Sequence, residues 1–280
     1  MIWELRHEHK VTLLLDIAGL PRSTYYYYTR KQKEPDKYAG LKEEICSIVA
    51  ENKGRCGYRR VTLELQNRGF HNNHKLVMKL MKQLGVSSKV RMKRYCSYKG
   101  EVGKTAPNLL GRNFSAKKPN EKWVTDVTEF SLFGEKLYLS PVLDLCSEDL
   151  VSYTISERPV LDMVLSMVEK AFATIPDDTG LILHSDQGWQ YRHKHYQGML
   201  KAKGVKQSMS RKGNCLDNAV MENFFGLLKS ELLYLQEFDS LEHFKAELID
   251  YLDYYNNRRI KAKLKGLTPA QHRYQTLQVA

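Results

Sequence analysis

The sequence predicts an α/β protein: a mixed five-stranded sheet with flanking helices, preceded by an all-α helix-turn-helix region. Three observations support this prediction. Residues 10–84 hold amphipathic helical patterns separated by glycine turns, residues 123–155 hold three strand-like segments, and residues 161–233 alternate between helical patterns and short apolar strands. Three meandering strands followed by an alternation of helices and strands indicate a sheet with both antiparallel and parallel pairs.

The all-α region is predicted to have two parts. Residues 1–35 are expected to form a short helix-turn-helix segment, in which Gly19 ends one helix and Pro21 suits the first turn of the next. Residues 36–90 are expected to form a helical DNA-binding domain with helices over 41–52, 58–68 and 73–84. Asn72 or Asn73 can cap the last helix, and Gly85 can end it.

This last helix has the outline of a DNA-reading helix. Its leucines recur on one stripe, whereas Lys75, Lys79 and Lys82 lie off that stripe. A glycine turn followed by a basic amphipathic helix is typical of helix-turn-helix proteins, although many helical hairpins also have basic outer faces. Residues 91–119 include most of a basic cluster at 89–94 and lack periodicity, so we expect a basic linker that contacts phosphates.

Residues 120–280 are predicted to form the α/β domain and its C-terminal helices. Strands are expected over 123–130, 137–145, 151–155, 181–184 and 205–209. Helices are expected over 161–174, 194–202, 216–233 and 241–256.

The charge distribution points to a polyanionic partner. The chain has 280 residues and a net charge of +12. Residues 1–118 carry 25 basic and 10 acidic residues, whereas residues 119–280 carry 19 and 22. Within the second part, residues 192–212 and 258–273 are basic bands without an acid, and they flank acidic segments. Such a pattern indicates a phosphate-binding rim around a pocket that needs negative charge for another purpose.

Other classes of protein are excluded by composition. Apolar runs end far short of the roughly 20 residues of a membrane span, and no signal peptide is recognisable, so no membrane partner is expected. The five cysteines are odd in number and widely spaced, without a C-x-x-C pair, so neither a disulfide framework nor a zinc knuckle is indicated. Free thiols fit the reducing cytoplasm.

Three acids stand where metal ligands are expected. Asp126 lies inside an apolar, threonine-rich strand, where a carboxylate is unfavourable unless it is compensated. Asp186 lies just beyond the carboxyl end of a strand, where ligands of α/β sheets usually bind. Glu222 faces away from the apolar stripe of its helix, and Lys229, seven residues later, faces nearly the same way. Any one of the acids alone would more often be a surface residue or a cap.

Together, the acids predict a site for hard divalent cations. Oxygen ligands suit Mg²⁺, or Mn²⁺, rather than zinc. Two such ions about 4 Å apart can activate an attacking oxygen and stabilise a leaving oxygen in phosphoryl transfer.

Several motifs make the chain resemble a known family. They are CGYRR at 56–60, WVTDVTE at 123–129, HSDQG at 184–188, GNCLDNAVMENFF at 213–225, LKSE at 228–231, YYN at 254–256 and GLTP at 266–269. The chain is similar throughout to the second-frame (OrfB-type) transposases of bacterial insertion sequences, which have a retroviral-integrase-like core. Asp186 and Glu222 are separated by 35 residues, the spacing of that family's last two acids.

The resemblance implies an RNase H-like fold and a DDE mechanism. Asp126, Asp186 and Glu222 would be the catalytic, metal-binding triad, and Lys229 would contact DNA near the element end. The expected partner is double-stranded DNA, both element ends and target, bound by a homo-oligomer at the bacterial nucleoid. In relatives the active enzyme is often a frameshift fusion with an upstream-frame partner protein.

The remaining candidate DNA contacts come from the basic segments. They are Arg59, Arg60, Lys75, Lys79, Lys82, Arg211 and Lys212.

Three other functions could be considered for the sequence. A tyrosine recombinase would need a basic cluster that commonly includes H-x-x-R, a motif absent from the sequence. A non-catalytic helix-turn-helix regulator would explain the basic N-terminal region but would leave the three acids without a role. A nuclease of the same fold without strand joining has the same residue types and stays open.

Overall fold

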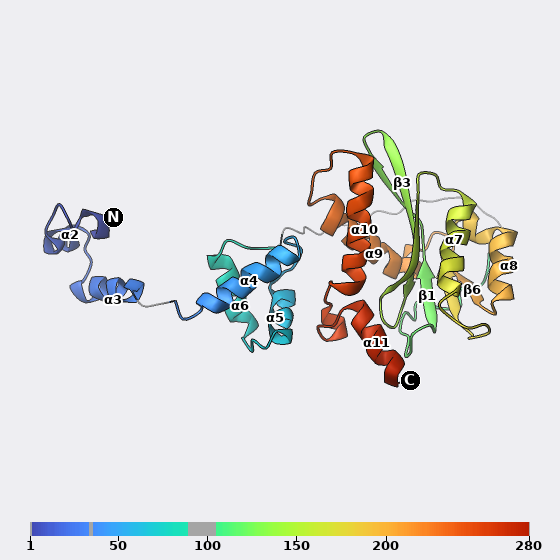
Figure 1. The fold of residues 1–280 in the computed structure, drawn as a ribbon, viewed down its shortest axis with the longest axis horizontal. Coiled ribbons are helices and arrows are strands. Elements are labelled where there is room, and N and C mark those ends of the chain that lie inside the picture. Colours follow the sequence, from blue (N-terminus) through green and yellow to red (C-terminus); the bar gives the residue numbers. More distant parts are fainter. Residues whose placement is uncertain (1, 34–35, 89–104, 280) are drawn as a thin grey trace. The chain divides into compact units, whose positions relative to one another are not determined.

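The computed structural model describes residues 2–33, 36–88 and 105–279 (Figure 1). The chain divides into two compact units, residues 1–47 and 48–280. The basic cluster at 89–94 and the first part of the expected linker, to residue 104, lie outside the described residues.

The first unit is built from short helices. They are α1 (Ile2–Leu5), α2 (Val11–Ile17), α3 (Arg22–Lys33) and most of α4 (Ala39–Glu51). Leu15 of α2 and Tyr25 of α3 are buried within this unit. The turn between the two helices contains Gly19 with a φ of +59°, a conformation that glycine adopts without strain.

The second unit begins within α4 and continues with the two helices predicted over 58–68 and 73–84. α5 (Tyr58–Asn67) and α6 (His74–Gln83) pack together through Val61, Leu65, Val77 and Leu80. The Asn73 side chain accepts a hydrogen bond of 2.9 Å from the Lys75 backbone N–H, so it caps α6 as expected. An HTH-like helical region therefore precedes the sheet.

The sheet is mixed, as predicted. Its strands are β1 (Lys122–Thr125), β2 (Thr128–Leu132), β3 (Glu135–Asp144), β4 (Leu150–Ser156), β5 (Ile182–Ser185) and β6 (Lys206–Met209). The order is β2-β3-β1-β5-β6, with β4 also paired to β3. The β1–β3, β2–β3 and β3–β4 pairs are antiparallel, whereas β1–β5 and β5–β6 are parallel.

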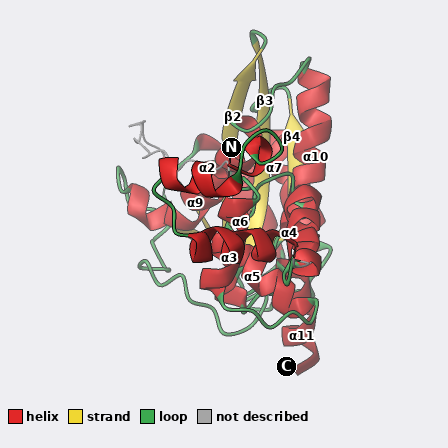
Figure 2. Ribbon diagram, turned by 90° about the vertical axis from the view of Figure 1, so that its left-hand side faces the viewer, coloured by secondary structure: helices red, strands yellow, loops and turns green. Residues whose placement is uncertain are grey.

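The number of strands differs from the expected five, although the expected mixed sheet is present. The described residues form six strands rather than five, because the strand expected over 123–130 is interrupted at Asp126 and Val127. β1 then pairs with β5, while β2 forms a hairpin with β3 that Figure 2 shows rising to a shared turn. That turn holds Phe133 and Gly134 at φ of +57° and +80°, as a tight two-residue hairpin turn requires.

Helices cover both faces of the sheet, which forms the middle of three layers (Figure 1). α7 (Leu161–Phe172) and α8 (Lys194–Ala202) pack on one face around Trp123, Val142 and Leu183. α9 (Ala219–Leu228) and α10 (Leu241–Asn257) pack on the other around Val124, Phe130 and Leu139. Because alternate residues of a strand point to opposite faces, β1 contributes Trp123 to one core and Val124 to the other.

The helix expected over 216–233 is divided. A 3₁₀ turn (Cys215–Asn218) leads into α9, and a π-helical turn (Lys229–Leu233) follows it. Another 3₁₀ turn (Ala262–Leu264) and α11 (Pro269–Val279) complete the chain. In the described part of the chain, no helix combines the length and apolar character needed to cross a membrane.

Candidate active site

Two of the predicted acids lie side by side at the carboxyl edge of the parallel strands. Val124 of β1 is the register partner of His184 of β5, and Asp126 and Asp186 each lie two residues after these partners, directly beyond the strand ends. Asp126 and Asp186 consequently line one cavity of about 250 Å³. The other lining residues are Val127, Glu129, Tyr138, Pro159, Gly188, Gln190 and Tyr191.

The charge at Asp126 is poorly compensated. Burial, together with the negative charges of Asp186 and Glu222, raises the pKa of its carboxyl well above the usual value. Two hydrogen bonds oppose this shift: the Val127 backbone N–H donates to Oδ1 at 2.8 Å, and Asn218 Nδ2 donates to Oδ2 at 3.1 Å. A cation beside Asp126 would relieve the repulsion among the carboxylates.

Asp186 is held by the turn that follows it. The Gly188 backbone N–H donates to its Oδ1 at 2.8 Å. Burial raises the pKa of Asp186, against the lowering effects of this hydrogen bond and of the Arg192 charge. A side chain at position 188 would place its Cβ 2.9 Å from the same oxygen. Glycine is therefore required for the carboxylate to keep this position.

Glu222 lies in the first turn of α9 and is half-buried. Burial raises the pKa of Glu222. The charge of Glu222 in turn raises the pKa of Asp126, so the two carboxyl groups interact electrostatically. Glu222 is nevertheless outside the lining of the Asp126–Asp186 cavity. Across the described residues, no three His, Cys, Asp or Glu side chains are close enough together to form a ready-made metal cage.

A buried clamp fixes the loop that leads into α9. The Asp217 carboxylate forms ion pairs with Arg211 at 2.9 Å and Arg112 at 3.0 Å, and Asn108 Nδ2 donates to it at 2.9 Å. Hydrogen bonds from Arg211 outweigh burial and hold the pKa of Asp217 well below its usual value. His184 Nε2 lies 2.9 Å from the Asp217 carbonyl oxygen, so the loop is also tied to β5.

His184 and Gln187, which flank Asp186, serve this scaffold. The His184 ring is buried between the Ser208 and Ser210 hydroxyls, and burial lowers its pKa. Gln187 Nε2 donates to the Ser210 carbonyl oxygen at 2.9 Å. Both side chains therefore position the strand ends around the acids.

The predicted DNA contacts have different surroundings. Arg59, Lys75, Lys79, Lys82 and Lys212 are exposed, as a DNA-binding side chain must be. Arg211 is exposed too, although its guanidinium is bonded to Asp217.

Two further candidates are partly enclosed. Lys229 is half-buried, with its ammonium 5.8 Å from the Phe130 ring centroid, and burial lowers its pKa. Arg60 donates to the Arg55 carbonyl oxygen and to Glu231, the latter at 3.1 Å. A DNA contact by either residue stays a prediction.

Sequence reasoning missed the charged network around Glu231. This side chain is 1% exposed and accepts hydrogen bonds from Arg259 at 2.8 and 2.9 Å and from Tyr251 at 3.1 Å. Arg55 donates to the Glu231 carbonyl oxygen at 3.0 Å and lies over the Tyr251 and Tyr254 rings. Nothing in the local pattern signals these contacts, because the partners are up to 176 residues apart.

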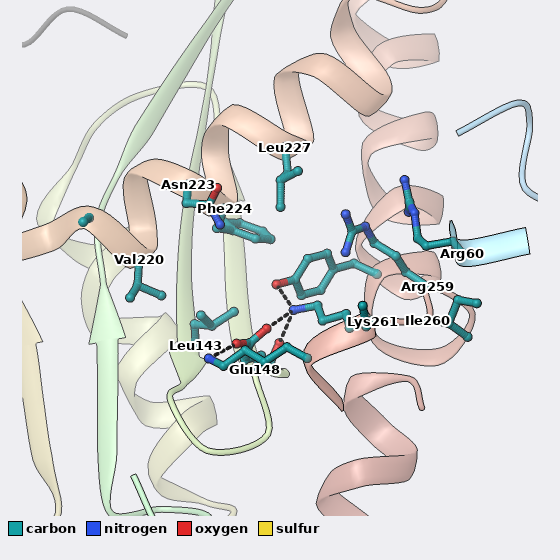
Figure 3. Close-up of a pocket in the computed structure, with 14 residues that line it drawn as sticks. Arg60, Leu143, Glu148, Val220, Asn223, Phe224, Leu227, Arg259, Ile260 and Lys261 are labelled. Carbon is teal, nitrogen blue, oxygen red and sulfur yellow. Dashed lines mark hydrogen bonds and ion pairs between the residues drawn. The ribbon is translucent and has the colours of Figure 1, made fainter. Parts of the chain in front are cut away.

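A larger cavity of about 510 Å³ lies against the face of α9 that carries Val220, Phe224 and Leu227 (Figure 3). Its one lining acid, Glu148, is ion-paired with Lys261 and Lys263. Paired carboxylates of this kind leave no negative charge for a metal ion, so the smaller cavity is the candidate active site.

Comparisons with known proteins identify two kinds of domain. Models of an integrase core domain match residues 116–215 and 222–277, and a model of an HTH-like domain matches residues 36–94.

Relatives match the chain over nearly its whole length. It is 55% identical over 273 residues, 98% of this chain and 96% of the relative, to the putative transposase InsK for insertion sequence element IS150 of Escherichia coli (strain K12). It is 34% identical over 244 residues, 86% of this chain and 96% of the relative, to the transposase for insertion sequence element IS904 of Lactococcus lactis. Among solved structures, the HTLV-2 integrase catalytic core domain in complex with magnesium gives a TM-score of 0.47 at 20% identity, over 57% of this chain and 99% of that chain.

Proposed function

Because the chain belongs to the family of insertion-sequence transposases with an integrase core, we propose that it cuts and joins DNA by a DDE-type mechanism. The observation that carries the proposal is the pair Asp126 and Asp186, which share one cavity at the carboxyl edge of the sheet. Glu222, whose charge reaches Asp126, would complete the triad.

The donor set fits two Mg²⁺ ions, with Mn²⁺ as an alternative. Carboxylate oxygens are the ligands these ions prefer. Burial, and then the charges of Asp186 and Glu222, raise the pKa of Asp126, and a cation would offset both effects. Asp126 and Asp186 would hold the ions from the sheet, and Glu222 from α9. When bound, the ions would supply the Lewis acidity that activates an attacking oxygen and stabilises a leaving oxygen.

The reaction has two phosphoryl transfers. Water first attacks a phosphodiester at the element end, which breaks the P–O3′ bond and frees a 3′ hydroxyl. That hydroxyl then attacks a phosphodiester of the target DNA, forms a new P–O bond and releases the target's 3′ oxygen. The chain contributes position and charge rather than a covalent nucleophile.

Basic side chains would hold the DNA backbone. The exposed lysines of α6 would bind an element end, and Lys229 would contact DNA beside Glu222. The protein would act as a homo-oligomer on the DNA, alone or as a fusion with an upstream-frame partner. Phosphate contacts make affinity fall steeply with salt.

The test is cleavage of end-bearing DNA with Mg²⁺, with and without a fused upstream partner. Alanine at Asp126, Asp186 or Glu222 is expected to abolish strand cleavage while DNA affinity stays nearly unchanged. Glu169→Ala, at an exposed acid on α7, is the matched control and should cleave normally. Normal cleavage by any of the first three variants would remove that residue from the triad.

Strand joining distinguishes a transposase from a nuclease of the same fold. A pre-cut element end with a free 3′ hydroxyl should become linked to a target duplex by the wild-type chain. Cleavage without any joined product would favour the nuclease.

A further inference from the structure

Asn218 stands at the N-cap of α9 and does not cap it. Asparagine is among the most favoured N-cap residues, because its side-chain oxygen can accept a hydrogen bond from a free backbone N–H of the first turn. The Asn218 side chain makes no such bond, and its φ and ψ of −121° and 26° differ from those of a usual cap. The helix therefore begins without the stabilisation that this residue type ordinarily provides.

The amide is used for Asp126 instead. Asn218 Nδ2 donates to Asp126 Oδ2 at 3.1 Å, while Asp126 Oδ1 is held by the Val127 backbone N–H. Both carboxylate oxygens are thus oriented. Asn218 is 4% exposed, and its Oδ1 is buried without a hydrogen-bond partner. A buried acceptor without a partner destabilises the fold, so this side chain carries a second unfavourable feature.

The surroundings keep Asn218 in this position. Its neighbour Asp217 is clamped by Arg211 and Arg112, which fixes the backbone just before the helix. Asn218 and Glu222 are four residues apart, so both side chains lie on the same face of the helix start. One amide consequently connects Asp126, at the end of β1, to the helix that carries Glu222.

We propose that Asn218 is a positioning residue of the active site. Its amide holds the Asp126 carboxylate in place near Asp186 and Glu222. This inference rests on the proposed function for its catalytic consequence, although the effect on cation binding stands apart from DNA cleavage.

The decisive variant is Asn218→Ser. Serine is also a favoured N-cap residue but is too short to keep the bond to Asp126. A purely structural role predicts unchanged cation affinity and cleavage. The positioning role predicts a melting temperature at or above that of the wild type, together with about 10- to 100-fold weaker Mn²⁺ binding and slower cleavage, the usual range for residues that orient metal ligands.

Mn²⁺ binding is measured on the full chain without DNA, from the electron paramagnetic resonance signal of the free ion, and cleavage is measured separately. Asn218→Ala removes the amide without adding a cap, so it shows whether the effect of Asn218→Ser comes from the new serine itself. It should show the same losses of Mn²⁺ affinity and cleavage rate. Ser240→Ala is the control, because it deletes a working cap of α10: the His243 backbone N–H donates to Ser240 Oγ at 3.1 Å. It should lower the melting temperature and leave both Mn²⁺ binding and cleavage unchanged.

The outcomes separate the two proposals. Wild-type Mn²⁺ affinity and cleavage in both Asn218 variants would overturn the positioning role. A wild-type chain that binds Mn²⁺ but cuts no DNA would overturn the proposed function, while weaker Mn²⁺ binding by the variants would still support the role of Asn218.

Discussion

Glu231→Gln is expected to destabilise the second unit strongly. The Glu231 carboxylate is 1% exposed and receives four hydrogen bonds, two from Arg259, one from Arg60 and one from Tyr251. Glutamine keeps the volume but removes the charge, and its amide N–H₂ faces arginine donors. Breaking a buried pair in this way costs about 3–5 kcal/mol, because the partner charge stays buried without compensation. That is a large part of the roughly 5–15 kcal/mol that stabilises a typical domain.

The assay is urea unfolding of the full chain, followed by circular dichroism. Glu247→Gln is the matched control, since Glu247 also forms an ion pair, with Lys53, but its side chain is 23% exposed. Exposed ion pairs contribute about 0.2–1 kcal/mol, so the control should lose no more than this. In a double-mutant cycle, Arg259→Gln combined with Glu231→Gln should lose less than the sum of the single losses. Equal losses for Glu231→Gln and Glu247→Gln would refute the reasoning.

The same pair predicts a dependence on pH. Burial would raise the pKa of Glu231, but the hydrogen bonds and charge of Arg259, with the charge of Arg60, lower it below the usual 4.5. A carboxyl with a lowered pKa in the folded state contributes stability that is present above pH 4.5 and is lost as the pH falls through the folded value. Wild-type stability should therefore fall more steeply in acid than that of Glu231→Gln.

Three other predictions concern the site, the DNA contacts and a turn. Gly188→Ala should displace the Asp186 carboxylate, because the new Cβ would lie 2.9 Å from its oxygen, and should lower cleavage at least tenfold with DNA affinity intact. Replacing the three exposed α6 lysines by alanine should reduce the slope of log affinity against log salt concentration by about 2.7, as measured by fluorescence anisotropy of labelled DNA. Arg60→Gln should change this slope little, because Arg60 is ion-paired with Glu231. Phe133→Asn should raise the free energy of unfolding by about 1 kcal/mol, and with it the melting temperature, because asparagine tolerates the positive φ of this exposed turn position better than phenylalanine. An unchanged or lower melting temperature would contradict the turn argument.

Periodicity predicted most elements because it reports burial directly. The exposure of Lys75, Lys79 and Lys82 on α6 follows from the 3.6-residue repeat, and the structure confirms it. The buried side of α6 is formed by Val77, Leu80 and Met81, whereas Leu76 is only half-buried. The end of β1 did not follow from the pattern. Residues 124–128 read as a continuous strand, because valine and threonine suit a strand on either side of Asp126. The interruption leaves the pairing unchanged, because β1 and β2 follow one antiparallel register along β3, from Trp123 opposite Asp144 to Leu132 opposite Glu135.

The surroundings of the acids depend on contacts that are remote in the sequence. The resemblance to a family singled out Asp126, Asp186 and Glu222, and the strand register accounts for the first two lying together. The bond between Asn218 and Asp126 joins residues 92 apart, and local pattern would have assigned Asn218 to an ordinary helix cap. The missing cap bond appears only once the fold brings the strand end beside the helix start.

α9 is fixed at both ends by such remote contacts. At its start, Asp217 and Asn218 tie it to the strand ends. Beyond its end, Glu231 ties the π-helical turn to α10 through Tyr251, to the segment after α10 through Arg259, and to the start of α5 through Arg60. A π turn holds one more residue than an α-helical turn, so it changes which side chains face inward. Glu231 is buried there, whereas Lys229 stays half-buried near Phe130. The orientation of α9, and with it the distance of Glu222 from Asp126, is therefore set by charged contacts on either side of the helix rather than by the helix sequence alone.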